Sequence, residues 1–549
     1  MSDQSTQVLP RARSGAAFDP WSTGAVLIAC IVLAPLVAVI WFALTPTDNI
    51  WPHLLSTTLP RYLVNTGIMM AGTGALTGVI GTLTAWLVVM YRFPGRGWLQ
   101  WALLMPLAVP AYVGAYALVD FLDYAGPVQT GLRDLFGWST SRDYWFPQIR
   151  TRGAAIVVIA AALYPYVYLL ARAAFREQSG AGYEVARALG AGPVARFWRV
   201  GLPLARPAIA AGCAVVMMET VNDFGTVDYF AVQTLTTGIF SVWRQGGNLG
   251  GAAQIACVIL SVIVLLVGLE RVSRRRSRFA ASARNVRPVT PTPLRGAGAW
   301  VATLACALPV LAGFVLPVGV LTSHALTAAQ WTAPGLAEAL GRSLMICGTA
   351  AVLAVLGGVF MVYGTRLSGR ALPRLLLPVT ALGYAAPGAV LALGILVPLA
   401  AFDNGLADLI LALTGTDPGL LLTGSAGVLV LAYVVRFFAI SEGAADAALG
   451  RVPASLPMAA RSLGRTAGQT LRAVHLPLIR ASVGSALLLT FVDAVKELPA
   501  TLMLYNHDTL STRVYAKASL ENIAEAAPAA LVICAVGLLA VVLLARANR

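Results

Sequence analysis

Charged residues are scarce in this sequence, and lysine is almost missing. Asp, Glu, Lys and Arg make up only 11% of the 549 residues, whereas 58% are hydrophobic and the mean hydropathy is +0.76. This composition excludes a soluble globular protein and favours a polytopic membrane protein. On a soluble chain, the formal net charge of +15 would suggest a nucleic-acid partner. Here the arginines gather at the ends of hydrophobic segments, so membrane topology explains them and we expect no nucleic-acid partner.

The two lysines, Lys496 and Lys517, both lack the setting of a nucleotide-binding loop. A P-loop requires Gly-Lys followed by Ser or Thr, but Val495 and Ala516 precede these lysines. We therefore expect no ATPase site in this chain, and any ATP that drives it must be hydrolysed by another subunit. The HExxH and GxSxG patterns of hydrolases are also missing from the sequence, so we expect a protein that is not an enzyme.

Cysteine and histidine are too few and too dispersed to form a metal site. The six cysteines lie in apolar stretches without a CxxC spacing, and we interpret them as packing residues. The four histidines are scattered, and we expect them to be solvated or interfacial. The sequence thus predicts no metal ligands and no cofactor bound by this chain.

Long apolar runs, in contrast, are abundant. Spanning a bilayer as a helix takes roughly 20 apolar residues. Backbone polar groups in lipid must be satisfied internally, so we predict an all-α polytopic membrane protein with about 12 transmembrane helices. The first run is too long for a cleaved signal peptide and should remain as the first helix. The apolar windows lie near residues 24–44, 66–90, 98–118, 154–171, 208–228, 252–269, 298–321, 343–363, 375–400, 420–438, 481–504 and 527–545.

The distribution of arginine predicts the orientation of these helices. Arginine-rich loops follow the even-numbered windows, and arginines also occur in the tail 1–23 and at the C-terminus. The loops on the other side are more mixed in charge. By the positive-inside rule, both termini and the arginine-rich loops are therefore cytoplasmic. We interpret the arginine-rich segment 271–297 as a cytoplasmic linker that fixes topology, a role compatible with contact to anionic lipids.

The linker separates two halves that repeat one another. Residues 184–203 (EVARALGAGPVARFWRVGLP) recur as 458–477 (MAARSLGRTAGQTLRAVHLP), an offset of 274 residues. The segments RFPGR at 92–96 and RLSGR at 366–370 have the same offset. We predict one half over 24–270 with a core at 60–270, and a second over 298–549 with a core at 338–545. Each half has six helices, so the repeat is parallel and a pathway is expected between the halves.

The repeated loop has a conserved spacing between its two copies. Small residues four apart, Ala and then Gly, share a helix face and allow close approach of another surface, and Leu-Pro then marks entry into the next helix. A groove on a partner protein would fit such a loop, whereas an ordinary interhelical loop is the alternative. The residues concerned are Glu184, Ala186, Gly190, Val200, Leu202 and Pro203 in the first copy, and Ala460, Gly464, Val474, Leu476 and Pro477 in the second.

Acidic residues lie within the apolar window that follows each loop. Glu219 and Asp223 are spaced i, i+4, as are Asp493 and Glu497 at the equivalent positions of the second half, so each pair is expected to share a helix face. A charge at this depth costs at least roughly 2.5–3.5 kcal/mol, so it should face a cavity, a partner or a substrate. These acids, with Lys496, either line a translocation path or form a structural ion-pair network. Carboxylates suit hard cations such as ferric iron without establishing that cargo.

The paired loops resemble the EAA-x3-G-x9-I-x-LP signature of inner-membrane permeases in binding-protein-dependent ABC importers. The resemblance covers both halves and implies the type I importer permease fold. It also implies that each loop forms a coupling helix on an ATPase subunit. Glu184 keeps the acid of the signature, whereas Met458 replaces it in the second copy, which puts in doubt whether the two loops hold the ATPase equally.

The segments after the loops are similar to those of two-domain ferric-iron permeases of this class. The similarity is carried by DFGTVDYFAVQTLTTGIFSVW at 223–243 and DAVKELPATLML at 493–504. It implies a bacterial inner-membrane protein that passes a small solute, ferric iron, to the cytoplasm, with thiamine or 2-aminoethylphosphonate as alternative cargoes. The implied partners are a pair of cytoplasmic ATPase subunits that use ATP and Mg, and a periplasmic substrate-binding protein that docks on loops such as 120–152 and 505–525.

A secondary transporter remains as an alternative from another class. The four carboxylates within apolar windows could couple transport to protons or sodium. The paired loops argue against this hypothesis, because an ion-coupled transporter has no need of two matched docking surfaces for an ATPase.

Overall fold

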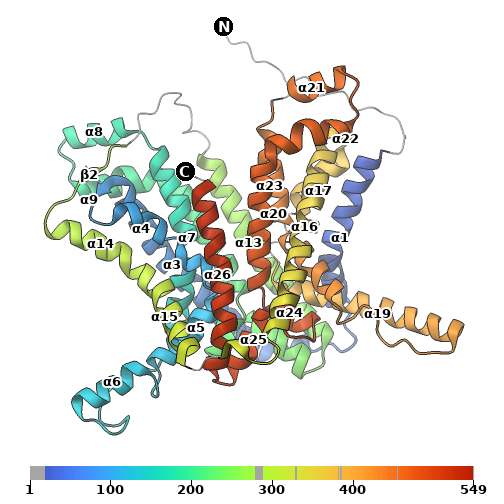
Figure 1. Cartoon of the computed structure of the whole chain (residues 1–549), viewed down its shortest axis with the longest axis horizontal. Coiled ribbons are helices and arrows are strands. Elements are labelled where there is room, and N and C mark those ends of the chain that lie inside the picture. The colour runs from blue at the N-terminus through green and yellow to red at the C-terminus, as the bar shows by residue number, and fades with distance from the viewer. Residues whose placement is uncertain are drawn as a thin grey trace. The chain divides into compact units, whose positions relative to one another are not determined.

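The computed structural model describes residues 19–277, 289–327, 330–380, 383, 386–453 and 455–547. Most of the expected tail (1–18) and the middle of the expected linker (278–288) lie outside these residues. Nearly all described elements are helices (Figure 1). Within the described ranges, the strands are β1 (Tyr91–Arg92) and β2 (Thr292–Pro293), which form one short parallel pair. The predicted all-α fold is therefore confirmed.

Eleven helical segments in the described residues are long and apolar enough to cross a membrane. A twelfth is a broken pair, Arg96–Ala108 and Ala111–Phe136, bent by 94° at Val109 and Pro110. About twelve spans were expected, and each expected window has its counterpart. The eleven unbroken segments are Pro20–Leu44, Leu59–Met90, Arg152–Glu177, Pro193–Asn222, Leu249–Leu269, Ala297–Thr327, Leu336–Ser368, Gly388–Thr414, Ala426–Gly450, Ala467–Lys496 and Ile523–Leu543.

The spans form two compact units that do not coincide with the two sequence halves. Unit 1 contains the described residues up to Val39 together with Ser343–Asn506, and unit 2 contains Ile40–Arg342 together with the described residues from His507 onward. Most of helix α1 (Pro20–Leu44) thus packs with the core of the second half. Helices α25 (Leu510–Ser519) and α26 (Ile523–Ala547) pack with the core of the first half.

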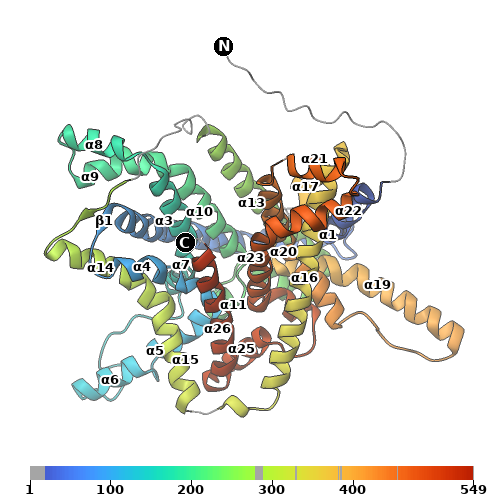
Figure 2. The same cartoon turned by 45° about the horizontal axis from the view of Figure 1, so that its top comes forward.

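Unit 2 is built on the mutual packing of α3 (Leu59–Met90), α7 (Arg152–Glu177) and α10 (Leu202–Asn222). Glycine permits the closest approach: a Cβ on Gly81 would lie 2.7 Å from the backbone nitrogen of Tyr168. Small residues at helix contacts are typical of membrane bundles, because no hydrophobic force drives helices together in lipid. Helix α26 packs on α15 (Leu316–Thr327) and on η1 (Met105–Ala108), as Figure 2 shows for α26 and α15.

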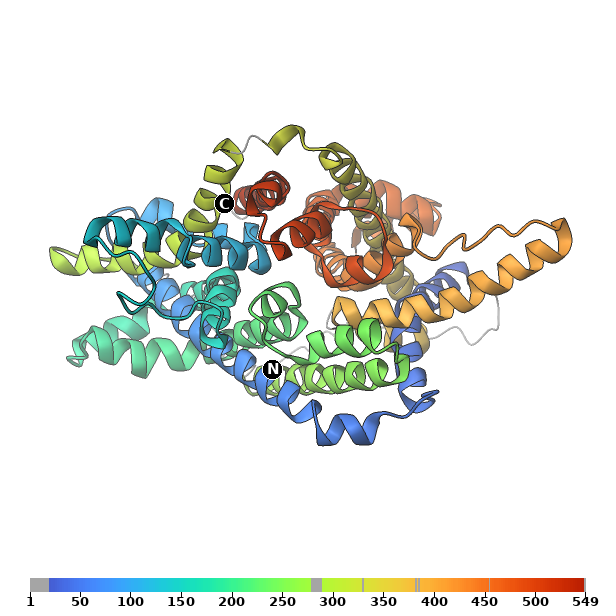
Figure 3. The same ribbon diagram turned by 90° about the horizontal axis from the view of Figure 1, so that it is seen from below.

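The remaining elements of unit 2 complete its two ends. In Figure 3, α12 (Leu235–Phe240) and α13 (Leu249–Ser277), both green, lie next to one another. Helix α5 (Ala111–Leu122) contacts α15 and leads into α6 (Pro127–Phe136). The other short elements are α2 (Trp51–Ser56), α4 (Arg96–Ala102), η3 (Ser241–Gln245), α14 (Ala297–Val310), η5 (Leu311–Val315) and η6 (Gln330–Thr332).

Unit 1 is built on α16 (Leu336–Ser368), α20 (Ala426–Gly450) and α23 (Leu476–Lys496). Two further helices of this unit are α17 (Ala371–Thr380) and α19 (Gly388–Thr414). Helix α1 lies against this core. The indole of Trp21 stacks on Phe360 with ring centroids 4.9 Å apart, and a Cβ on Gly394 would lie 2.0 Å from the carbonyl oxygen of Pro35.

The sequence repeat is also a repeat of individual elements. Helices α10 and α23 have equal lengths and begin 274 residues apart, and so do α11 (Gly225–Tyr229) and α24 (Pro499–Leu504). The expected windows 208–228 and 481–504 are not continuous helices, however. Each helix ends after Asn222 or Lys496, and a short second helix follows. Asp223 and Glu497 therefore adopt extended backbone after the helix, and the expected shared helix face is wrong.

A glycine substitution tests the packing of α1 on α19. Gly394→Leu should lower the unfolding temperature of the detergent-solubilised protein, because the added side chain meets the backbone at Pro35; overpacking of this kind costs about 1–3 kcal/mol. Gly405→Leu on the same helix is the control, since a Cβ there meets no atom within 4 Å. Equal unfolding temperatures for the two variants would contradict this packing.

Candidate functional site

The first repeated loop is a short helix, a left-handed glycine and a second helical segment. Helix α8 (Gly180–Ala188) ends where the N–H of Gly190 donates to Arg187 and the N–H of Ala191 donates to Ala186. Gly190 has φ +80°, a conformation that suits glycine because it has no Cβ. The chain continues through α9 (Pro193–Arg196) and the π-helical turn η2 (Phe197–Gly201) into α10, whose first turn contains Leu202 and Pro203.

An aromatic cluster anchors this loop to the helices of unit 2. The indole of Trp86 on α3 contacts Phe175 on α7 and Phe197 on η2, edge to face. Gly201 lies directly against that indole, so a Cβ there would clash with the Trp86 ring. The hydroxyl of Tyr183 on α8 donates to Gln178. Val200 packs against the same cluster. Spacing alone did not identify these anchors, although aromatic residues beside the repeated loop were a visible signal.

The outer surface of the loop is left without cover in this chain. Glu184 is exposed, and so are the apolar side chains of Val185, Leu189 and Val194, which are 58%, 82% and 71% accessible. Ala186 is half-buried. A short cytoplasm-facing helix with exposed leucine and valine is a surface that a partner protein would cover.

The second loop repeats this backbone in unit 1. Helix α21 (Ser455–Ser462) ends at Gly464, which has φ +79°, and the N–H of Arg465 donates to Ala460. Helix α22 (Ala467–Thr470) and the π-helical turn η7 (Leu471–His475) then lead into α23. Val474 and Leu476 are half-buried, and Pro477 lies in the first turn of α23. Met458 and Leu463 are exposed, at 65% and 81%.

Different residues anchor this second loop. His475 stands at the position of Gly201, and its ring contacts Tyr363 edge to face. The hydroxyl of Tyr363 donates to the carbonyl of Ala467, 2.8 Å away, and Trp21 of α1 lies edge-on to the same tyrosine. The two loops thus share a backbone but are held by unrelated side chains.

The acids at the helix breaks cap the short helices that follow. The carboxylate of Asp223 accepts hydrogen bonds from the N–H of Thr226 at 3.0 Å and of Val227 at 3.1 Å, at the start of α11. Glu497 accepts in the same way from the N–H groups of Ala500 and Thr501 at the start of α24. A carboxylate at a helix N-terminus satisfies N–H groups that have no partner within the helix. This capping role was not foreseen from the spacing.

The two breaks differ in their basic neighbours. Glu497, whose side chain is 1% exposed, lies 3.6 Å from the guanidinium of Arg436 on α20. Ala162 occupies the corresponding position of the first half. In unit 1, Arg436 and Lys496 both attract Asp493 electrostatically. In unit 2, Glu219 is half-buried on α10, one turn before the capping Asp223.

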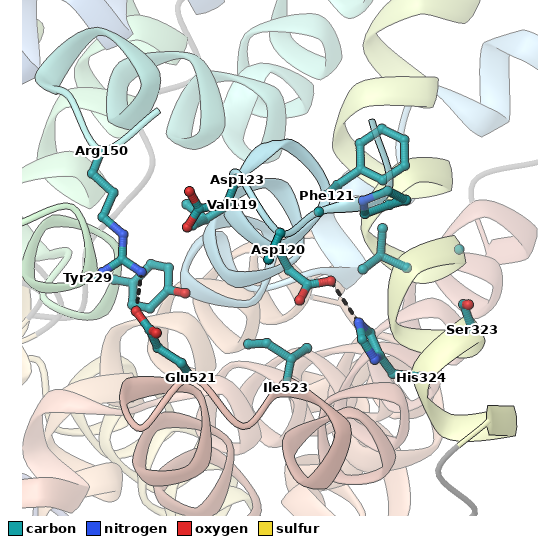
Figure 4. A pocket seen from close by; sticks show the side chains of 15 residues that line it. Val119, Asp120, Phe121, Asp123, Arg150, Tyr229, Ser323, His324, Glu521 and Ile523 are labelled. Carbon is teal, nitrogen blue, oxygen red and sulfur yellow. Dashed lines mark hydrogen bonds and ion pairs between the residues drawn. The ribbon is translucent and has the colours of Figure 1, made fainter. Parts of the chain in front are cut away.

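Unit 2 also contains a cavity of about 580 Å³ at the end that carries α6 and α25 (Figures 1 and 4). Two ion pairs line it: Arg150 with Glu521 at 2.6 Å, and His324 with Asp120 at 2.7 Å. The partners are 371 and 204 residues apart in sequence, so spacing could not reveal them. In the described residues no group of three or more His, Cys, Asp or Glu side chains could hold a metal ion.

Comparison with known proteins gives a consistent picture. Residues 74–279, which include the first loop and the break at Asp223, match the family described as "Binding-protein-dependent transport system inner membrane component". The chain is 25% identical over 488 residues to the Fe(3+)-transport system permease protein FbpB 2 of Haemophilus influenzae, which spans 86% of this chain and 87% of that protein.

Shorter relatives align with a single half. The chain is 30% identical over 210 residues to the molybdenum transport system permease protein ModB of Escherichia coli, which spans 36% of this chain and 87% of ModB. It is 28% identical over 212 residues to the sulfate transport system permease protein CysT of Salmonella typhimurium, which spans 37% of this chain and 71% of CysT.

The capping carboxylates generate a prediction about stability. Asp223→Ala removes a cap and should cost about 1 kcal/mol. Glu497→Ala should cost more, about 3–5 kcal/mol, because it also leaves the charge of Arg436 buried beside an empty position. Thermal unfolding in detergent compares the variants, and the Arg436→Ala/Glu497→Ala double variant should recover part of the loss. Equal unfolding temperatures for the two single variants would exclude this role of Arg436.

Proposed function

Because the chain belongs to the family of binding-protein-dependent transport system inner membrane components, we propose that it is the fused permease subunit of an ATP-driven importer for ferric iron. The observation that carries the proposal is the pair of loops at 184–203 and 458–477, whose left-handed glycines and hydrogen bonds match at an offset of 274 residues. A single chain with two such loops offers one docking surface to each of two ATPase subunits.

The charge and packing at the loop ends support a cytoplasmic location for both loops and both termini. Arginines gather on this side of the chain, in agreement with the positive-inside rule. In unit 1, Trp21 near the start of α1 contacts Tyr363, which bonds to α22. In unit 2, Val541 near the end of α26 packs against the Trp86 cluster beside α8. Each chain end therefore lies beside a coupling loop, in the inner membrane of a bacterium.

The ATPase partner supplies the energy in this proposal. A pair of ABC ATPase subunits binds ATP and Mg and covers the exposed apolar residues of α8 and α21. Its closed and open states must contact the loops differently, because only differential contacts shift a conformational equilibrium. The rigid anchoring of each loop by Trp86 or by His475 transmits that movement to the helices that follow the loops.

The extent of the similarity favours iron over the other cargoes. The Fe(3+)-transport relative spans 86% of this chain, whereas the molybdenum and sulfate relatives span little more than a third of it. Thiamine and 2-aminoethylphosphonate are the alternative cargoes. Capping accounts for Asp223 and Glu497, so we assign the lining of the pathway chiefly to Glu219 and Asp493, with Lys496 beside them. The cargo is released to the pathway by a periplasmic substrate-binding protein.

Secondary transport is the competing hypothesis, and energy coupling separates the two. Proteoliposomes containing the chain and its ATPase should take up ferric iron when ATP is supplied and continue to do so after an uncoupler collapses the proton gradient. Uptake that stops with the uncoupler while ATP remains high would favour ion coupling through the carboxylates.

Glycine substitutions test the coupling role of the loops. Gly190→Val and Gly464→Val each place a branched side chain at φ near +80°, a strain of about 1–2 kcal/mol, and should lower uptake while the ATPase keeps hydrolysing ATP. Gly192→Val is the matched control, because its φ is −67° and the space around it is equally open. Normal uptake by both loop variants would count against the coupling role.

The pathway assignment generates its own prediction. The double variant Glu219→Ala/Asp493→Ala should assemble with the ATPase but transport ferric iron poorly, since it removes both acids that are not used as helix caps. Uptake per hydrolysed ATP in proteoliposomes is the measurement, and Glu338→Ala, a surface carboxylate, serves as the control. A correctly folded double variant with full uptake would refute the lining of the pathway by these acids.

A further inference from the structure

The cavity of unit 2 has two charged walls that come from distant parts of the chain (Figure 4). Arg150, which precedes α7, lies over the ring of Tyr229 and pairs with Glu521 in the turn between α25 and α26. On the opposite wall Asp120 of α5 pairs with His324 of α15. The side chain of Glu521 is 70% exposed, so this ion pair is open to solvent at the mouth of the cavity.

Glu521 occupies a backbone conformation that disfavours any side chain. Its φ is +59°, and the equivalent residue of the first half is Gly247, with φ +62°. The two turns are otherwise alike: Asn248 caps α13 through the N–H of Gly251, and Asn522 caps α26 through the N–H of Glu525. The turn itself therefore favours glycine. Backbone strain kept at one residue points to a role for its side chain.

The mouth of the cavity carries more acid than base. Asp120, Asp123 and Glu521 line it, against Arg150 and one histidine. Asp123 is exposed, and among the described residues it takes part in no ion pair. The three acids do not form a metal site with any other ligand in the described chain. A compact, hydrated basic side chain matches this arrangement better than a bare cation does.

An ordered aromatic hairpin flanks the cavity. After α6, the rings of Phe136, Trp138 and Tyr144 stack in succession. The backbone N–H groups of Thr140 and Ser139 donate to Asp143 and hold the pKa of that carboxyl below its usual range. Trp145 is nevertheless 86% exposed. A preorganised loop that presents an aromatic side chain next to a charged pocket has the composition of a protein-binding surface.

We propose that this cavity is a receptor for a lysine or arginine side chain of the periplasmic substrate-binding protein, with Glu521 as the acid that receives it. On docking, the incoming cation replaces Arg150 as the partner of Glu521, while Trp145 and its hairpin cover the adjoining surface. This inference rests on the proposed function, since it requires a binding protein on the side opposite the coupling loops.

The test uses the full chain with its ATPase in nanodiscs and the binding protein that stimulates ATP hydrolysis by this complex. Glu521→Gln should weaken binding about tenfold, since it removes the receiving charge and leaves Arg150 to repel the incoming cation. Arg150→Gln should bind as well as the wild type or better, because it frees the acid. Surface plasmon resonance measures both affinities, and the wild-type affinity should fall with added salt more steeply than that of Glu521→Gln.

Two further variants separate docking from stability. Glu521→Gly restores the residue that the turn favours, so it should unfold at or above the wild-type temperature and yet bind as weakly as Glu521→Gln. Glu338→Gln, an equally exposed carboxylate in an ion pair with Arg342, is the matched control and should bind normally.

The outcomes distinguish this inference from the proposed function. Equal weakening by Arg150→Gln and Glu521→Gln would mean a structural ion pair and would overturn the inference. Unchanged affinity of Glu521→Gln for a binding protein that stimulates the wild-type complex would overturn the inference alone. Transport and ATP hydrolysis by the wild-type complex that no binding protein stimulates would overturn the proposed function, and the inference with it.

Discussion

The requirement that every backbone N–H and C=O group find a partner away from water shapes this protein more than any other constraint. Long helices satisfy it internally, but α10 and α23 each end within a stretch that reads as continuously apolar. Asp223 and Glu497 resolve the problem by capping the short helix that follows. The acids that look anomalous in an apolar segment are thus required by the break, and the break in turn places polar groups where a translocation path would need them.

The two halves keep this backbone and vary the side chains that support it. Trp86 packs over Gly201 in one half, whereas the other half has Phe360 and His475 at these positions. Arg436 neutralises Glu497, and its counterpart is an alanine. Met458 replaces the acid of Glu184. A fused chain permits such divergence, because each half always meets the same partner half, and the two coupling loops can therefore differ in how firmly they hold the ATPase.

Hydropathy predicted the spans, and the 274-residue spacing predicted both loops, because these properties are local in sequence. The break after Asn222 was missed, since acids spaced i, i+4 also fit one face of a helix. The segment exchange was beyond reach, because it depends on close contacts such as Gly394 with Pro35 and Gly537 with Ala108, which hydropathy does not encode. The outer cavity joins residues 204 and 371 positions apart, and no periodic pattern marks them.

The central claim is that two cytoplasmic loops receive mechanical work from a separate ATPase. Hydrogen–deuterium exchange of the full chain, alone and in complex with the ATPase, tests it most directly. We expect slower exchange at 180–196 and 455–470 in the complex, because binding buries these short helices. Slower exchange confined to other segments, with both loops exchanging as in the free chain, would contradict the account.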